Sequence, residues 1–364
     1  MHVHFVNENI GGHATMHAHI RSALAGDGSS ISASFFDVPP RHGLERLAGA
    51  RIPGLARLDA DFQPIRAQLA RSLVVRRHLS GLREAPDALH LYTHNAALLS
   101  IGHMRRVPSL VSLDATNRQN SLNIPGREPT AFTPATVAAS VPFEQRVYSA
   151  ARRVVAHSRW CADSVLTYGV SPAKVEIVPF GITAPPEVPA RPERERPRIV
   201  FVGTSMERKG GWRLLELWRR SLAGTADLTL VTLEEVPPAE GLEVRNDVRP
   251  GDGKIEAILA EADIFAMPSS IDSFGYAALE AMAASLPVVA VANAALPELV
   301  ADGETGILVP PHDDEAFAVA LMDLARDRDE RRELGDAGRR RFMERFDARK
   351  TTAALIELIR DAVR

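Results

Sequence analysis

The sequence has a single cysteine and no long apolar run. Cys161 cannot form an internal disulfide, and a lone cysteine fits a reducing compartment. No segment approaches the roughly 18 consecutive apolar residues of a membrane span, and the N-terminus lacks the basic and apolar parts of a signal peptide. The formal net charge is -3, so no general basic field indicates nucleic-acid binding. These absences predict a cytoplasmic protein without a nucleic-acid partner.

Lysine is also scarce, since the 43 basic residues include only Lys174, Lys209, Lys254 and Lys350. A GC-rich coding genome explains most of this bias toward arginine. The one lysine that stands beside a glycine pair, Lys209, therefore stands out as a candidate functional residue.

Short apolar runs alternate with helix-length amphipathic stretches along the chain, a pattern typical of parallel α/β layers. Residues 184–197 combine five prolines with alternating charge and are predicted to be a linker. The pattern predicts two Rossmann-like, doubly wound domains that face each other across a cleft. They cover 1–183 and 198–345, and a last helix over 346–364 is expected to pack back on the first domain.

The segment FVGTSMERKGG (201–211) places Lys209 between an apolar strand and a helix. Glycines and the free N–H groups of a helix start suit a phosphate, and Arg208 and Lys209 add two cations. The alternative is a solvated turn with incidental charge, and the segment has no Walker A pattern.

Two acidic residues stand near each other in PSSIDSFGYAALEAMAASLPVVAVANAALPELVADGETGILVPPHD (268–313). Asp272 lies in a loop after a strand, and Glu280 lies about one turn into the next helix. A carboxylate accepts hydrogen bonds from two neighbouring hydroxyls, so the pair suits a sugar or a ribose.

This segment resembles the signature of retaining glycosyltransferase family 4, whose pattern is Pro-Ser-x-x-Glu-x-Phe-Gly, four residues, then Glu-Ala. RVVAHSRWCADSVLTYGVSPAKVEIVPFGI (153–182) is similar to the approach to the family's hinge, and NIGGH (9–13) to its N-terminal glycine loop. FVGTSMERKGG resembles the family's diphosphate-binding loop. The resemblance implies the two-domain GT-B fold, with the acceptor on the N-terminal domain and a nucleotide sugar on the C-terminal domain.

Carried over residue by residue, the resemblance implies that Lys209 neutralises the leaving diphosphate and that Glu280 binds the ribose. The backbone amides of Ser273, Phe274 and Gly275 would meet the sugar and the phosphate. Further contacts are implied on the donor for Gly12, Thr204, Arg208, Asp247 and Val248, and on the acceptor side for Gly11. In the expected fold His13 faces the cleft beside the glycine loop, where it could contact the acceptor. His94, at the end of the DALHLYTH strand, either packs against the sheet or contacts the acceptor.

Three positions depart from the family pattern. Asp272 replaces the first glutamate, Thr204 replaces an arginine that Arg208 could supply, and Asp114 stands where a histidine is usual. Asp114, Asp272 and Lys209 are the catalytic candidates. The carboxylates of Asp114 and Asp272 would flank the donor sugar and would repel a carboxylate on that sugar. We therefore expect the donor to carry a neutral or amino hexose rather than a uronic acid.

Residues 41–83 contain nine arginines and only three acidic residues. A helix there would place Phe62, Ile65, Leu69 and Leu73 on one side, either as a core face with a solvated basic back or as a docking surface for anionic lipid at the inner membrane face.

The function expected from the resemblance is retaining, metal-independent transfer of a hexose from a UDP- or GDP-linked donor, with no cofactor. The acceptor could be a small molecule, a glycan or a lipid-linked molecule. A nucleotide-sugar epimerase on the same fold and a catalytically degenerate donor-binding subunit are the alternatives.

Overall fold

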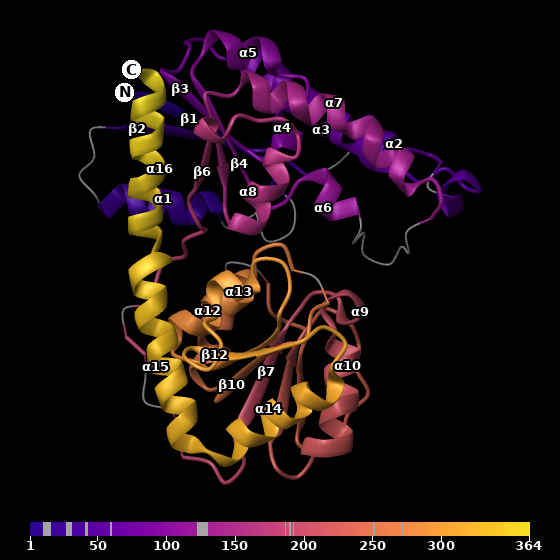
Figure 1. Ribbon diagram of the computed structural model, residues 1–364, viewed down its shortest axis with the longest axis vertical. Coiled ribbons are helices and arrows are strands. Elements are labelled where there is room, and N and C mark those ends of the chain that lie inside the picture. The colour runs from indigo at the N-terminus through magenta and orange to yellow at the C-terminus, as the bar shows by residue number, and fades with distance from the viewer. Residues whose placement is uncertain are drawn as a thin grey trace. The chain divides into compact units, whose positions relative to one another are not determined.

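The computed structural model describes residues 1–364 except 10–15, 27–30, 41–42, 59, 122–129, 186, 189–190, 192, 250–251 and 271. Contacts between residues divide the chain into two compact units. The N-terminal unit comprises Met1–Pro179 and Arg349–Arg364, and the C-terminal unit comprises Phe180–Ala348 (Figure 1). Each unit contains a six-stranded sheet in which every pairing is parallel.

The sheet of the N-terminal unit has the strand order β2-β1-β3-β4-β5-β6. Its strands are β1 (His2–Asn7), β2 (Ser32–Asp37), β3 (Ala88–Tyr92), β4 (Ser109–Leu113), β5 (Arg153–Ala156) and β6 (Val175–Ile177). Its helical elements are α1 (Met16–Gly26), α2 (Gly43–Ala48), η2 (Leu55–Leu58), α3 (Gln63–Ser80), α4 (His94–Ala97), α5 (Ile101–Arg106), α6 (Asn117–Ser121), α7 (Thr133–Ala150), α8 (Arg159–Leu166), η3 (Pro172–Lys174) and, from the end of the chain, α16 (Ala348–Val363).

The sheet of the C-terminal unit has the order β12-β11-β10-β7-β8-β9. Its strands are β7 (Arg198–Val202), β8 (Asp227–Val231), β9 (Leu242–Arg245), β10 (Ile264–Met267), β11 (Val288–Val291) and β12 (Gly306–Val309). Its helical elements are α9 (Met206–Lys209), α10 (Gly211–Leu217), η4 (Trp218–Leu222), α11 (Lys254–Ala260), α12 (Tyr276–Ala283), α13 (Leu296–Leu299), α14 (Asp314–Arg326) and α15 (Arg328–Arg345).

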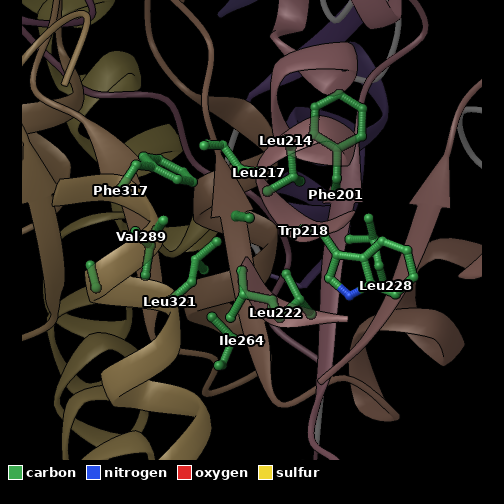
Figure 2. Packing of buried hydrophobic residues seen from close by; sticks show 14 of the residues in the cluster. Phe201, Leu214, Leu217, Trp218, Leu222, Leu228, Ile264, Val289, Phe317 and Leu321 are labelled. Carbon is green, nitrogen blue, oxygen red and sulfur yellow. The ribbon is translucent and has the colours of Figure 1, made fainter. Parts of the chain in front are cut away.

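Each unit has its own apolar core, as parallel sheets covered on both faces require. In the C-terminal unit the core contains Phe201, Trp218, Leu228 and Phe317, all at most 2% exposed (Figure 2). Local capping sets where helices begin. Ser158 accepts the Cys161 N–H at the start of α8 (3.1 Å). The two parallel sheets and their Rossmann-like layering confirm the fold class that the alternating pattern predicted.

The division into units differs from the domain boundaries expected from the sequence. Residues 184–197, expected as a linker, fall within the C-terminal unit. Arg191 Nε in this segment donates to the Ala262 carbonyl (2.6 Å), and Arg194 pairs with Asp263 (3.8 Å). Burial lowers the pKa of Arg191. These contacts tie the proline-rich segment to the C-terminal unit.

The buried face of α3 agrees in part with the expectation from the sequence, because Ile65 is buried and Leu69 packs against the core, whereas the other two expected residues are exposed. Phe62, which precedes α3, and Leu73 are 40% and 36% exposed, whereas Ile65, Val75 and Leu79 are buried. Arg71 is also buried, and its guanidinium donates to the carbonyls of Glu8 (2.9 Å from Nε) and Pro39 (3.2 Å from Nη1). Phe62, just before the helix, and Leu73, in its second half, therefore present apolar side chains to solvent.

Candidate active site

The strand order of the C-terminal unit reverses between β7 and β10, because the chain moves outward from β7 in one direction and from β10 in the other. In open α/β sheets, ligands bind at the carboxyl ends of the strands on either side of such a reversal. The segment after β7 ends in Lys209, and the segment after β10 contains Asp272. The Lys209 ammonium and the Asp272 carboxylate form an ion pair at this position. The fold thus brings together two of the predicted site residues, 63 positions apart in sequence.

A glycine and two polar side chains hold these two segments together. Gly210 has φ 74°, and a Cβ there would lie 2.6 Å from the Pro268 carbonyl oxygen, so a larger residue would push the segments apart. Ser269 Oγ donates to the Lys209 carbonyl (3.3 Å), and Asn293 Nδ2 donates to the Ser269 carbonyl (2.8 Å). The close approach of the two backbones places Lys209 next to Asp272.

Asp272 also organises the start of α12. Its Oδ1 accepts the N–H of Gly275 at 2.8 Å and that of Phe274 at 3.4 Å. Gly275 has φ 91°, and a Cβ there would meet the side chain of Leu296 at 2.6 Å. Of the three backbone amides expected to face the donor, those of Phe274 and Gly275 therefore donate to Asp272. The third residue, Ser273, is partly buried in the same turn.

Glu280 lies partly buried on α12, and its carboxyl group has no hydrogen bond or ion pair to another described residue. Burial raises the pKa of the Glu280 carboxyl to about 7, and the charge of Glu256 adds to this effect. A carboxyl without a partner in the protein can accept hydrogen bonds from a ligand that carries hydroxyl groups.

The cations near Lys209 differ in their surroundings. Arg208 is partly buried, and its guanidinium has no hydrogen bond or ion pair to any residue in the described part of the chain. Thr204 is exposed, and Ser205 caps α9 by accepting the Arg208 N–H (3.4 Å). Arg208 is therefore the side chain whose charge is available to replace the arginine absent at Thr204.

Asp247 follows β9 in a cluster of charges on the surface. Its carboxylate lies 3.1 Å from Arg245 Nε and 2.7 Å from Lys254 Nζ. The hydrogen bonds from Arg245 and Lys254 lower the pKa of Asp247. Val248, the other residue expected along the base, is partly buried. This cluster fixes the loop after β9 through paired charges.

The N-terminal unit encloses His94 rather than exposing it. His94 Nε2 pairs with Glu144 Oε1 at 3.0 Å, and the side chains are 1% and 0% exposed. The sequence left open whether His94 packs within the fold or contacts an acceptor, and the structure places its ring against a buried carboxylate. Asp114 lies directly after β4 and is partly exposed. Gly11, Gly12 and His13 lie outside the described residues.

Sequence reasoning missed Glu144, because an acid within the helix sequence FEQR resembles a solvent-facing residue. The structure surrounds its carboxylate with four partners besides His94. Glu144 accepts from the Asn117 N–H (3.0 Å), Tyr168 Oη (3.0 Å), Ser140 Oγ (3.3 Å) and Tyr148 Oη (3.3 Å). Ser140 and Tyr148 lie one turn away on the same helix, but His94, Asn117 and Tyr168 come from distant parts of the chain, and no local signal indicated that they surround Glu144.

Known proteins resemble this chain in sequence and in fold. The model of a glycosyl transferase 4-like domain matches residues 11–181, and that of glycosyl transferases group 1 matches residues 196–327. An MMP alpha-(1->4)-mannosyltransferase of Mycolicibacterium hassiacum is 32% identical over 236 residues, which are 61% of this chain. The match covers 57% of that mannosyltransferase, so the chain spans somewhat more than half of this relative.

Two solved structures share the fold over nearly all of this chain. Sucrose-phosphate synthase from Thermosynechococcus elongatus superposes with a TM-score of 0.75 at 18% identity, covering 99% of this chain and 98% of its own. HepE of Anabaena, in complex with UDP and glucose, superposes with a TM-score of 0.69 at 15% identity, covering 99% of this chain and 100% of its own. With two matched family models over most of its length and two Rossmann-like units, the chain belongs to the group 1 glycosyltransferases of the GT-B fold.

Proposed function

We propose that this protein transfers a hexose from a nucleoside-diphosphate sugar to a hydroxyl group of an acceptor, with retention of configuration at the anomeric carbon. The observation that carries this proposal is the meeting of Lys209 and Asp272 at the reversal in strand order of the C-terminal unit. Glu280 contributes a carboxyl group for ribose hydroxyls. UDP and GDP are the expected nucleotides, and no metal or cofactor takes part.

In this mechanism the bond between the anomeric carbon and the diphosphate oxygen breaks, and the diphosphate leaves with added negative charge. Lys209 and Arg208 stabilise that charge, which is larger in the transition state than in the bound donor. The acceptor oxygen forms the new bond on the same face, and its proton passes to the departing diphosphate oxygen. Asp114 is a further candidate for contact with the donor sugar.

The partners of Asp272 favour this front-face route over a double displacement. A nucleophilic carboxylate needs one free oxygen directed at the anomeric carbon. In Asp272, Oδ2 pairs with Lys209 and Oδ1 accepts the Gly275 N–H. We therefore assign Asp272 the role of positioning Lys209 and the start of α12.

The proposal is tested by incubating the protein with UDP-glucose, UDP-galactose, UDP-N-acetylglucosamine and GDP-mannose, with and without added sugars. We expect slow release of nucleoside diphosphate without an acceptor and faster release with one, and NMR of the product should show the donor's anomeric configuration. An inverted product would overturn retention. An epimerised nucleotide sugar would establish an epimerase, and binding of UDP or GDP without turnover would establish a degenerate subunit.

The surface formed by α2 and η2 supports a second, narrower proposal, which is peripheral contact with an anionic membrane at the cytoplasmic face. Leu47, Ile52 and Leu55 are 70%, 41% and 46% exposed. Arg46, Arg51 and Arg57 are exposed in the same short stretch. Apolar side chains flanked by arginines suit the boundary between lipid headgroups and acyl chains. No helix in the described ranges is long and apolar enough to cross a membrane.

Co-sedimentation with vesicles tests this contact. We expect binding to vesicles with 30% phosphatidylglycerol and little binding to pure phosphatidylcholine. Replacing Arg46, Arg51 and Arg57 by serine should abolish the binding, whereas Arg219→Ser and Arg220→Ser, at exposed positions in the C-terminal unit, should preserve it. Equal binding to both kinds of vesicle would contradict the electrostatic part of the proposal.

A further inference from the structure

We propose that a cavity within the N-terminal unit binds an uncharged, hydroxyl-rich ring, and, resting on the proposed function, that this ring belongs to the sugar acceptor. The cavity has a volume of about 230 Å³. It is lined by the N-terminal halves of α3 and α7, by α6 and by one residue of α4. The ribbons of these helices are labelled in Figure 1. Helices α4 and α6 follow β3 and β4 directly, so the cavity lies at the carboxyl edge of the sheet, where α/β folds bind ligands.

The chemistry of the lining selects a neutral ligand. Side-chain amides, including Asn95, Asn117 and Asn120, and hydroxyls, including Ser121 and Thr133, make up its polar part. None of the residues described along the cavity wall carries a charge. A phosphate or a carboxylate would need a cationic partner to offset its loss of hydration, whereas hydroxyl groups are satisfied by neutral donors and acceptors.

A buried acceptor in this wall lacks a partner. Asn95 Oδ1 is removed from solvent and has no hydrogen bond to any described residue. A polar atom left in this way costs folding free energy unless a ligand or water satisfies it. The backbone of Asn95 is fixed, because its N–H donates to Thr93 Oγ1 (3.3 Å) at the start of α4. Because Asn95 lines the cavity, a rotation of its side chain toward a ligand hydroxyl would let Oδ1 accept a hydrogen bond and would remove the unfavourable contribution.

The polar wall is held in place from behind. Gln68 and Asn117 exchange two hydrogen bonds between their amides, 2.9 and 3.3 Å long. The buried carboxylate of Glu144 accepts from the Asn117 N–H (3.0 Å) and from Ser140 Oγ (3.3 Å). Because Asn117 and Ser140 both line the cavity, this network fixes the geometry of its wall before a ligand binds.

The size and the apolar part of the cavity indicate a single ring. A volume of about 230 Å³ lies below the roughly 300–1,000 Å³ of sites for drug-sized ligands. Ile65 and Val137 contribute apolar surface beside the amides and hydroxyls. A pyranose or a cyclitol has both characters, since its C–H groups form apolar faces and its hydroxyls project from the rim.

Ligand-observed NMR tests the cavity directly, using saturation transfer from the full chain to methyl α-D-mannopyranoside, myo-inositol and glucose 1-phosphate. We expect transfer to at least one neutral ring and less to glucose 1-phosphate. Asn95→Leu should abolish the transfer. Gln145→Leu, a matched change on α7 whose amide donates to the Tyr168 carbonyl and does not line the cavity, should preserve it. Equal transfer in wild type and Asn95→Leu would overturn the proposal, as would a preference for glucose 1-phosphate.

Asn120→Ala provides a second variant whose folding is not in question, because Asn120 is an exposed residue of the lining. It should weaken binding of the neutral ring severalfold with an unchanged melting temperature. If Asn120→Ala binds the ring as tightly as wild type and Asn95→Leu loses binding but is poorly folded, the folding defect explains that loss. This combination would overturn the assignment of the cavity as the binding site of the ring.

Kinetics then separate this proposal from the proposed function. With a donor that the enzyme uses, Asn95→Leu should raise the KM of the neutral acceptor about ten- to a hundredfold. The affinity for free UDP or GDP, which we assign to the C-terminal unit, should stay unchanged by calorimetry. If the wild type uses no nucleotide sugar, the proposed function is wrong, but the NMR experiment still shows whether the cavity binds a neutral ring. If transfer proceeds but the acceptor KM does not change in Asn95→Leu, the cavity assignment fails alone.

Discussion

His94 Nε2 lies 3.0 Å from Glu144 Oε1, and neither side chain is more than 1% exposed. Burial is the largest single influence and lowers the pKa of His94, but the charge and hydrogen bond of Glu144, together with the charge of Glu8 and a hydrogen bond with Asn117, outweigh it and the net pKa is raised. Burial likewise raises the pKa of Glu144, but the charge of His94 and the hydrogen bonds from His94, Asn117 and Tyr168 together outweigh burial, so the net pKa is lowered. The two groups therefore form a charged pair in the interior of the N-terminal unit.

This pair predicts a window of maximal stability. The contribution of His94 is complete below its unfolded pKa near 6.5 and is lost as the pH rises through the raised folded value. The contribution of Glu144 is complete above about 4.5 and is lost as the pH falls through the lowered folded value. We expect the pair to contribute most between about pH 4.5 and 6.5. Glu144→Gln should lower the free energy of unfolding by about 3–5 kcal/mol, because it leaves the buried His94 cation without a negative partner.

Urea unfolding of wild type, Glu144→Gln and the double variant His94→Gln/Glu144→Gln across pH 4 to 8.5 measures both effects. The double variant should recover part of the loss and show a weaker dependence on pH. The same loss of stability from Glu144→Gln at every pH would show that its charge does not matter.

Lys209→Ala removes the cation that pairs with Asp272 at the strand-order reversal. We expect turnover to fall by about 10²–10³, with a smaller change in donor affinity, because the charge on the diphosphate grows in the transition state. Lys209→Arg keeps the charge with a different geometry and should retain part of the activity. Measuring kcat and KM for the donor separates the effects, and wild-type kcat in Lys209→Ala would remove the diphosphate assignment.

Arg208→Ala tests whether this residue replaces the arginine absent at Thr204. We expect the Kd for UDP or GDP to rise by about five- to tenfold, since the loss of one charge-assisted contact costs roughly 1–1.5 kcal/mol. Arg220→Ala removes an exposed arginine of the same unit and should leave the Kd unchanged. Titration calorimetry of both variants checks this, and equal affinities would indicate that Arg208 faces solvent when the nucleotide binds.

Glu280→Gln should have opposite effects on stability and on binding. In the folded protein the Glu280 carboxyl has a pKa of about 7 against 4.5 unfolded, so stability falls as the pH rises from about 4.5 to 7. Glutamine avoids this loss, and the variant without nucleotide should melt at a higher temperature than wild type at pH 8 but not at pH 4. Its binding of free nucleoside diphosphate should weaken by about 1.5–3 kcal/mol. Tight binding of UDP or GDP by the variant would show that Glu280 does not hold the ribose.

Asp114→Asn tests the carboxylate after β4 as a contact of the donor sugar. If it lies at the reacting centre, turnover should collapse while the melting temperature stays the same. Unchanged kinetics with every donor would show that Asp114 only caps its loop. Comparison of UDP-glucose with UDP-glucuronic acid tests the related preference for a neutral or amino hexose, and rapid use of the uronic acid would refute it.

The sequence by itself determined the layered α/β fold and the two segments that follow β7 and β10. Apolar runs of four to six residues between amphipathic stretches can hardly form anything but parallel strands joined by helices. Turns and helix starts depend on the local sequence. The glycines and charged residues that follow two apolar runs were therefore enough to place Lys209 and Asp272 just after strands. The position of Glu280 was predictable for the same reason, since its spacing from Asp272 places it about one turn into α12.

The tertiary structure alone decided which charged residues are buried and which apolar residues are not. Glu144 and Arg71 look like solvent-facing residues in sequence, yet each is buried because partners from other elements satisfy it. Conversely, Phe62 and Leu73 remain exposed although their spacing predicts a core face. The neutral cavity beside Asn95 follows the same logic, because its wall is assembled from four helices distant in sequence. The free energy of burying a polar group depends on partners that only the folded chain supplies.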